Sequence, residues 1–562
     1  MNIKRVLLLT KVASKGYTFW NQFAISVQKT GRNKKQSAAL KIFLTILIAI
    51  ALMSVVAIFL VMLGFNYLQV EVMGTFAGIE GAGMFTAALV AFLLTLIFSF
   101  MSAPSAMHHG KDMPLLVTLP IDRDELYTSR LILHYRANAP LYWFLLIPGV
   151  VVTAISYGIT IKMVFATVLL LVCGPMLPIV LSATATQLVI ARSRGGGKRV
   201  RSEFLASMLL ILLLLIAQGL ASRWLRSGMD SSTLQAISLS VGKILRMAMK
   251  VLFLFAWQGR ALISSESVVP LVLSLLFVGI ALWPLVVCGT RTFPLAVSKA
   301  LEGDSSVRSR RRKSRSTPAQ SSVVWTLCKK EFSVINSASA FMMELYAEAA
   351  IPLVLILVYA ITGSLRDISA VVAVFTTLPQ FPLLLCGILL LMGSISMMSG
   401  TSVSREGEHL TMMRVLPIPP SKHLQAKVLA HMLLFFLPYS LYCVLGLIWF
   451  HLIGLHLLWM VPLGAVIIAT SSCLGLMVDF NKPRLDWQNP QQAVKQNMNG
   501  LMAMGLSVAT IAVCAGAGYL LAFILGWSIG LTGLILIVLA IIELTIAWNL
   551  ALKSARQCYA PQ

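Results

Sequence analysis

Long apolar runs of about twenty residues alternate along the chain with short polar segments. A helix rises about 1.5 Å per residue, so a run of this length crosses an apolar bilayer core of about 30 Å. The pattern therefore predicts an all-α polytopic membrane protein with about 12 transmembrane helices. The predicted spans are 41–65, 83–103, 139–157, 163–190, 204–221, 268–290, 346–363, 371–398, 428–450, 457–478, 500–525 and 529–552.

The polar segments between these runs differ in charge. Residues 1–41 hold nine Lys or Arg and no acid, and basic residues also gather in 191–203, 291–330 and 479–499. Residues 66–82 carry two Glu and no base. Because loops rich in Lys and Arg stay on the cytoplasmic side, twelve crossings place all the basic segments and both termini inside.

One segment departs from this charge rule. Residues 222–267 should lie outside, and long loops obey the rule weakly, so we keep the topology. Within this segment, 234–257 is amphipathic and predicts a helix along the outer interface, or one that re-enters the membrane. A thirteenth span is the remaining alternative. The basic side chains of the segment are Arg223, Arg226, Lys243, Arg246, Lys250 and Arg260.

Composition agrees with a membrane protein. The 562 residues are 58% hydrophobic and 12% charged with a mean hydropathy of +0.86, whereas soluble domains are about 25% charged. The net charge of +25 is typical of basic loops beside an anionic leaflet. The run RSRRRKSRS could bind nucleic acid, but it lacks interleaved aromatics, so we expect the lipid bilayer as its partner and no nucleic acid. The eight cysteines show no paired spacing, and we expect no metal site.

The two halves of the chain resemble each other when the sequence is shifted by 297 residues. Six spans per half is an even number, so the halves have the same orientation. The predicted domains are a first half, 1–300, with an N-terminal amphipathic helix, a basic disordered linker, 301–324, and a second half, 325–562. The shift places Gly110 on Gly407, Leu119-Pro120 on Leu416-Pro417, Arg130 on Lys427 and His134 on His431.

Each half has a polar loop after its second span, with a glycine, eight further residues and then Leu-Pro-Ile. We expect a short helix in each loop that ends at the leucine, because the residue before proline is disfavoured in the α region. Two such exposed helices suit a protein that grips two copies of one partner, or a two-fold dimer. The candidate site residues are Gly110, Lys111, Asp112, Leu119 and Pro120 in the first loop, and Arg405, Glu406, Gly407, Glu408, Leu416 and Pro417 in the second.

With these loops, the sequence resembles the membrane subunits of ABC-2-type exporters, and most of all the fused bacterial permeases with two six-span halves. That family places a coupling helix in the loop after the second span of each half. WTLCKKEFSVIN, residues 325–336, is similar to the elbow helix that leads into a half, and residues 3–20 would be its first-half partner. NPQQAVKQNMNG, residues 489–500, enters span eleven and also carries the resemblance.

The resemblance implies a permease of type V exporter-like architecture that forms the substrate pathway in a bacterial cytoplasmic membrane. Its partners would be separate ABC ATPase subunits, two copies, which bind ATP and Mg²⁺, while this chain binds no cofactor and is not itself an enzyme. The residues agree, because the phosphate-loop motif GxxxxGK[ST] does not occur in the sequence. Arg405, Glu406 and Glu408 would form ion pairs with a docked ATPase, and a solvated loop without a partner is the alternative. A homodimer of the chain remains an alternative.

Two other functions stay open. A membrane enzyme acting on lipid-linked substrates would need convergent acids, a metal or an activated nucleophile at the membrane surface. An ion-coupled secondary transporter would need several charged residues near the midplane, and Glu543 stands alone inside span twelve. We expect Glu543 to form a structural hydrogen bond between helices, with a substrate or proton site as the alternative.

Overall fold

A computed structural model describes most of the chain, and the part that it describes contains helices and no strand. Eleven of these helices are long and apolar enough to cross a membrane. The described residues are 3–14, 57, 59–108, 112–192, 204–206, 208–209, 211–213, 215–216, 234–263, 268–311, 322–362, 375–487, 489–495 and 497–560. The eleven are Phe59–Phe76, Ala82–Met107, Arg123–Tyr157, Ile161–Arg192, Val269–Lys299, Ser339–Val358, Phe381–Thr401, Pro420–Trp449, Gly454–Asn481, Met498–Ile524 and Ile529–Cys558.

Each of these eleven helices overlaps a predicted span, which confirms the all-α membrane fold. The remaining predicted span, 204–221, lies partly outside the described residues, and its described part contains the shorter apolar helix Phe204–Leu213. The first span differs in extent, since its helix continues to Phe76 instead of ending at 65. The additional part of the helix contains Glu71, which is buried.

Glu71 joins the end of this first helix to the start of the next. Its carboxylate accepts the backbone N–H of Gly81 at 3.0 Å and of Gly83 at 2.6 Å, and the Tyr157 hydroxyl also donates to it. The first N–H groups of a helix lack partners within the helix and carry partial positive charge. The hydrogen-bonding capacity of the buried Glu71 carboxylate is therefore met by N–H groups at the start of α4. Glu71 does not need contact with water.

The chain divides into two compact units, Met1–Ser306 and Val307–Gln562. The boundary falls inside α12 (Val269–Arg311), which is helical well beyond its membrane span. Residues 301–311 of the predicted disordered linker are therefore helical, whereas 312–321 lie outside the described residues. Adding residues to an existing helix needs no new nucleation, so a polar segment can prolong a stable apolar helix.

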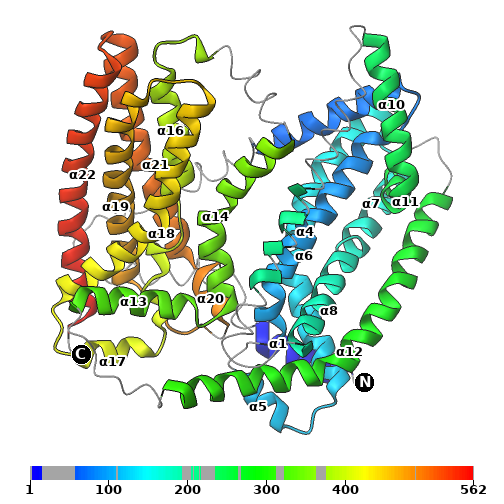
Figure 1. The fold of residues 1–562 in the computed structure, drawn as a ribbon. Coiled ribbons are helices and arrows are strands. Elements are labelled where there is room, and N and C mark those ends of the chain that lie inside the picture. Colours follow the sequence, from blue (N-terminus) through cyan, green and yellow to red (C-terminus); the bar gives the residue numbers. More distant parts are fainter. Residues whose placement is uncertain are drawn as a thin grey trace, which may run out of the picture. The chain divides into compact units, whose positions relative to one another are not determined.

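In the first unit, α4 is the central helix and packs against α6, α8 and α11, while the N-terminal helix α1 packs against α6 (Figure 1). Gly149 of α6 allows the close approach to α4, because a Cβ there would lie 2.3 Å from the Ala87 Cβ. The helices of this unit are α1 (Ile3–Ser14), α4 (Ala82–Met107), α5 (Met113–Thr118), α6 (Arg123–Tyr157), α7 (Ile161–Cys173), α8 (Met176–Arg192), α10 (Leu234–Val251), α11 (Phe253–Ala261) and α12.

The amphipathic segment predicted at 234–257 forms the pair α10 and α11, separated by a break at Leu252. The ring of Phe255 lies 5.2 Å from that of Phe92, which is ten residues into α4, or about 15 Å along its axis. Gly259, later in α11, contacts Gly81 at the start of α4. The chain therefore reaches the level of Phe92 and returns to the Gly81 end of α4 within α11. These contacts favour the re-entrant alternative over a thirteenth span.

In the second unit, α19 is central and packs against α18, α21 and α22, while the predicted elbow helix forms as α13 and packs against α18. In both units an amphipathic helix thus lies against the first long helix after the polar loop. The helices are α13 (Val323–Ile335), α14 (Ser339–Thr362), α16 (Phe381–Ser394), η1 (Ser399–Thr401), η2 (Ser404–Glu406), α17 (His409–Val415), α18 (Pro420–Trp449), η3 (Gly454–His456), α19 (Leu457–Asn481), α20 (Pro490–Val494), α21 (Met498–Tyr519), η4 (Leu520–Ile524) and α22 (Ile529–Cys558).

Candidate functional site

Two short helices occupy equivalent places in the two units. α5 follows α4, and α17 follows α16 and the tight turns η1 and η2. Each helix ends at an extended leucine, with φ −82° and ψ 151° at Leu119, and φ −71° and ψ 135° at Leu416. Proline follows each leucine and disfavours the α conformation there. The predicted short helix with a Leu-Pro end is confirmed in both loops.

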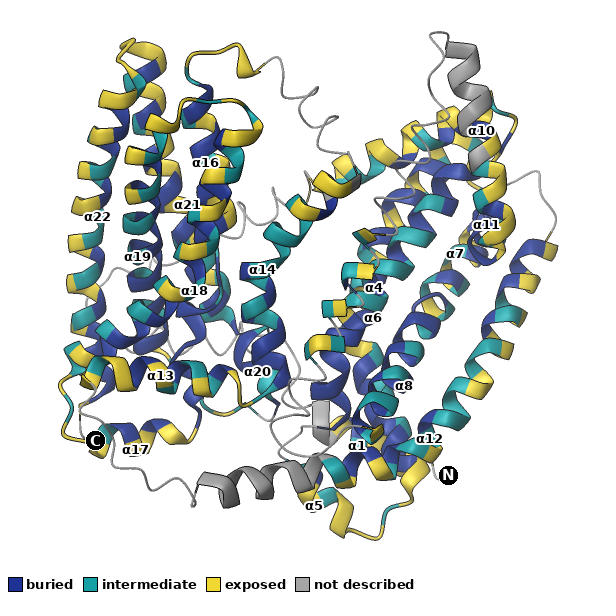
Figure 2. Cartoon of the chain, viewed as in Figure 1, coloured by how far each residue is buried: buried dark blue, intermediate teal, exposed yellow. Residues whose placement is uncertain are grey.

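The offset of 297 residues also relates the burial of the two helices. Met113 and Leu410, which are 297 apart, are both fully buried and hold α5 and α17 against their units. Leu115 and Met412, again 297 apart, are 65% and 67% exposed. The long helices α6 and α18 begin with the same spacing. Each unit therefore presents a short helix with one side anchored and with exposed apolar residues on another side. Figure 2 shows the buried and exposed positions of α17.

The first-loop candidates have different environments. Gly110 and Lys111 lie outside the described residues. Asp112 accepts a hydrogen bond from the Arg130 guanidinium, with 2.6 Å between Nη2 and Oδ2, and this ion pair ties the start of α5 to α6. Leu119 and Pro120 are exposed at the end of α5.

In the second loop, Arg405 and Glu406 contradict the prediction of a charged surface. Glu408, Leu416 and Pro417 are exposed, but Arg405 and Glu406 are only 3% and 2% exposed. The tight turns η1 and η2 carry these two residues inward, where other charges of the same unit surround them. Arg405 and Glu406 are thus internal residues in this conformation and do not offer ion pairs to a docked protein.

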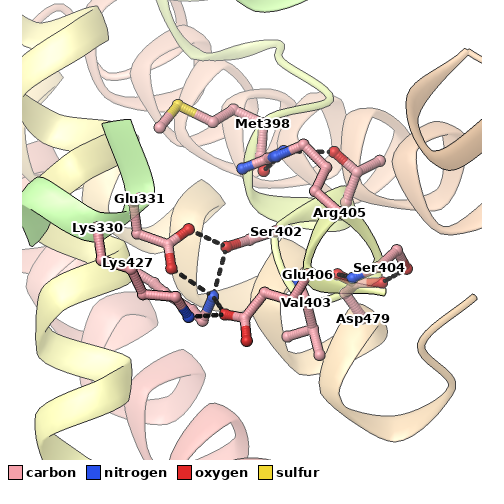
Figure 3. Close-up of polar contacts among 11 residues, drawn as sticks. Lys330, Glu331, Met398, Ser402, Val403, Ser404, Arg405, Glu406, Lys427 and Asp479 are labelled. Carbon is pink, nitrogen blue, oxygen red and sulfur yellow. Dashed lines mark hydrogen bonds and ion pairs between the residues drawn. The ribbon is translucent and has the colours of Figure 1, made fainter. Parts of the chain in front are cut away.

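Glu406 and three charged side chains around it form one largely buried network (Figure 3). Lys427 Nζ lies 2.6 Å from Glu406 Oε1 and 2.8 Å from Glu331 Oε1, and it donates to Ser402 Oγ at 3.0 Å. Lys330 Nζ lies 2.9 Å from the same Glu406 oxygen. The Ser402 hydroxyl donates in turn to Glu331 Oε2 at 3.0 Å. Two acids and two bases neutralise each other and join α13, η2 and α18.

The turn beside this network is held by a buried carboxylate from α19. Asp479 Oδ2 accepts the backbone N–H of Val403 at 2.6 Å and of Ser404 at 2.9 Å. Its other oxygen accepts from the Ser404 hydroxyl and from Asn499 Nδ2 at 2.9 Å. The Asp479 carboxylate thus holds the backbone of the turn in place, because it accepts consecutive N–H groups that have no helical partner.

Arg405 completes the turn from the other side. Its Nη1 donates to the Met398 carbonyl at 2.8 Å and to Thr401 Oγ1 at 2.6 Å. Burial lowers the pKa of the Arg405 guanidinium, and the negative charges of Glu331 and Asp479 oppose that change. An arginine keeps its charge in proteins, so the neighbouring acids are what make its burial tolerable.

The electrostatics of Glu406 follow from the same geometry. Burial by itself raises the pKa of this carboxyl group, but the positive charges of Lys427 and Lys330 outweigh burial and lower the pKa to about 2. Glu406 is therefore ionised at neutral pH. A buried ion pair is stable only when its charges are matched and hydrogen-bonded, and here both lysines meet one carboxylate oxygen.

Gly407 turns the chain out of the network toward α17. Its φ of +55° and ψ of −129° lie in a region that residues with a Cβ rarely adopt. A Cβ at this position would also lie 3.0 Å from the Trp487 ring. The glycine shared by both loops therefore has a backbone role in the second loop.

Comparison with known proteins then assigns the chain to a family. The family model described as membrane protein of 12 TMs matches residues 35–547, which is most of the chain. The chain belongs to this family of twelve-span membrane proteins. No curated protein and no solved structure matches it. The family agrees with the predicted twelve spans, of which the described residues show eleven.

Glu543 lies apart from the loop helices, inside the membrane span of α22. The side chain is half-buried, and its Oε2 is buried with no hydrogen-bond partner within the described structure. The predicted hydrogen bond between helices is therefore not seen at this atom. Among the described residues, no group of three or more His, Cys, Asp and Glu side chains could hold a metal ion.

Sequence reasoning missed Glu331 and Lys330 as parts of the candidate site. Both lie in the elbow helix, whose amphipathic pattern places charges on one side without showing what they meet. Lys427 was visible as the counterpart of Arg130 at the 297-residue offset. Arg130 and Lys427 are both buried, and each forms an ion pair with an acid of the adjoining loop. Asp112 pairs with Arg130, and Glu406 pairs with Lys427. The matched basic positions were the signal for an internal ion pair.

Proposed function

We propose that this protein is the membrane subunit of an ATP-driven exporter of the ABC-2 type. One observation carries the proposal: α5 and α17, 297 residues apart, are short helices of the same register with exposed apolar side chains. A repeated surface helix suits a repeated partner, and ATPase subunits of such exporters act in pairs. In this proposal the spans form the substrate pathway, and two separate subunits bind ATP and Mg²⁺.

The apolar character of the helices refines what the partner contacts. Leu115 and Leu119 on α5, and Met412 and Leu416 on α17, provide exposed apolar contacts, with Glu408 as the charged neighbour of α17. Buried apolar side chains surrounded by polar groups are typical of the energetically dominant part of an interface. We therefore place the main docking contacts on these side chains, with charge at the margin.

The network behind α17 provides a physical route for coupling. Glu406 lies at the start of the α17 loop and pairs with Lys330 of α13 and Lys427 of α18. A displacement of α17 would be passed to both helices together, because separating these buried charges is costly. In the proposed mechanism, ATP-driven approach of the two ATPases moves the loop helices, and the attached spans alternate the pathway between the two membrane faces.

The test is association with an ATPase subunit in the native membrane. We expect the tagged full chain, solubilised mildly, to retain an ATP-hydrolysing subunit in two copies. Leu115→Asp together with Met412→Asp should reduce that association at least tenfold, since each change puts a charge in an apolar contact. Leu455→Asp is the matched control, because Leu455 is 69% exposed in η3, at the other end of α18. Equal loss in the control, or undiminished association in the double variant, would overturn the proposal.

A further inference from the structure

The helix α10 lies at the end of the first unit that is opposite to α5 (Figure 1). Gly81 precedes α4, whereas α5 follows the last residue of α4, and α4 has 26 residues, or about 39 Å. α10 contacts the Gly81 end of the unit: Arg246 Nη1 donates to the Ala77 carbonyl at 3.0 Å, and Gly242 lies against the Ala77 side chain. α10 and α5 therefore face opposite membrane surfaces.

One side of α10 is occupied by packing within the unit. Met249 is buried in the apolar core of the first unit, and Leu245, Ala248 and Leu252 are packed against that core. These residues share one face, because helix neighbours recur every three or four positions. This face therefore supplies the apolar packing of α10 against the unit.

The opposite side of α10 combines cations with large apolar side chains. Lys243, Arg246 and Lys250 are exposed at the spacing i, i+3 and i+7, which places them on one face. Met247 and Val251 stand among them and are 55% and 67% exposed. α10 and α11 contain no acidic residue. This face is neither purely polar, as contact with water favours, nor free of charge, as contact with hydrocarbon favours.

Such a mixed face fits the headgroup region of a bilayer. Long basic side chains reach the phosphates while neighbouring apolar side chains enter the acyl boundary. α11 begins in the apolar layer, where Phe253 contacts Phe277 with 5.1 Å between ring centroids, and then returns toward the Gly81 end of α4. α10 therefore stands where the chain passes from the aqueous side into the membrane.

We propose that the outward face of α10 binds the headgroups of anionic phospholipids through Lys243, Arg246 and Lys250. The charge of the segment supports this occupant. Loops on the outer side of a membrane usually contain few Lys and Arg residues. Residues 222–267 are predicted to lie outside and nevertheless carry six of them. A local cluster of cations with no acid in α10 or α11 gains its stabilisation from anionic lipid phosphates near the surface. This proposal is independent of the ATPase partner.

The experiment measures lipid binding by the purified full chain in detergent. Phosphatidylglycerol is titrated and retained lipid is counted by native mass spectrometry, with phosphatidylcholine as the zwitterionic comparison. Lys243→Gln with Lys250→Gln should weaken phosphatidylglycerol binding by about fivefold per cation, or about 25-fold in total. Lys243→Arg with Lys250→Arg keeps the charge and should leave binding unchanged. Arg246 is kept because it also holds Ala77.

Further experiments distinguish lipid binding at α10 from binding of other anions and from an effect of the total charge of the protein. Lys422→Gln with Lys553→Gln removes two exposed lysines from the second unit and should keep the tight phosphatidylglycerol site. Inorganic phosphate at millimolar concentration should not displace the lipid. The proposal is overturned if phosphatidylcholine binds equally, if the glutamine pair on α10 binds normally, if phosphate or an acidic peptide displaces the lipid, or if the second-unit pair loses binding to the same extent.

Discussion

The ammonium nitrogen of Lys427 lies 2.6 Å from Glu406 Oε1, and both side chains are almost completely buried. This ion pair joins the first turns of α18 to the loop that leads into α17. Lys330 shares the same carboxylate oxygen, so one acid connects two helices. The pair therefore sets how firmly the exposed helix α17 is attached to the second unit.

Glu406→Gln is expected to destabilise the second unit strongly. The change leaves Lys427 and Lys330 close together with one compensating acid, Glu331, and loss of one partner of a buried pair costs about 3–5 kcal/mol. Thermal unfolding of the purified protein in detergent measures the effect. Glu408 lies at an exposed position two residues away, where an interaction contributes about 0–1 kcal/mol, so Glu408→Gln should change stability by no more than about 1 kcal/mol. Equal effects of the two changes would show that the network does not hold the loop.

The contribution of Glu406 should also depend on pH. Its pKa is lowered from 4.5 to about 2 in the folded protein, so folding favours the ionised form. A lowered folded-state pKa gives stability that is complete above about pH 4.5 and is lost as the pH falls toward 2. The difference in unfolding temperature between the wild type and Glu406→Gln should be constant from pH 7 to 5 and narrow below pH 4.5. A difference that grows with acidity would contradict this ion pair.

Gly407→Ala should destabilise the α17 loop by about 1–3 kcal/mol. The backbone conformation with φ +55° is strained for alanine, and its Cβ would contact the Trp487 ring at 3.0 Å. Unfolding temperature and protease sensitivity of the loop measure the change. Gly387→Ala in α16 is the matched control, because a Cβ there meets no atom within 4 Å and the helix tolerates alanine better than glycine. A stable Gly407→Ala protein with an unaltered loop would contradict the prediction.

Labelling of single introduced cysteines should place both short helices on one face of the membrane. Thr118→Cys on α5 and Val415→Cys on α17 are at exposed positions, and six predicted spans separate them, five of which are membrane-length helices within the described residues. An impermeant thiol reagent should reach both from the same side and Lys243→Cys on α10 from the other. The unaltered chain gives the background of its own cysteines, six of which are buried. Labelling of α5 and α17 from opposite faces would exclude a pair of like-oriented halves.

Local features of the fold followed from the amino-acid sequence. Apolar length predicts the spans, because a helix of fixed rise must match the bilayer core. The ends of α5 and α17 were predicted from Leu119-Pro120 and Leu416-Pro417, because the steric effect of proline acts on the residue directly before it. The re-entrant path of α10 and α11 was left among three alternatives, since amphipathicity does not specify depth.

The environment of Arg405 and Glu406 was decided by tertiary structure. In the sequence SREGE these residues stand in a polar loop, and their neighbours along the chain give no reason for burial. Their burial depends on Lys427, 21 residues beyond Glu406, and on Glu331, 96 residues before Lys427. A charge can leave water when opposite charges meet it in space, and only the packing of α13, α18 and the turn η2 brings these charges together.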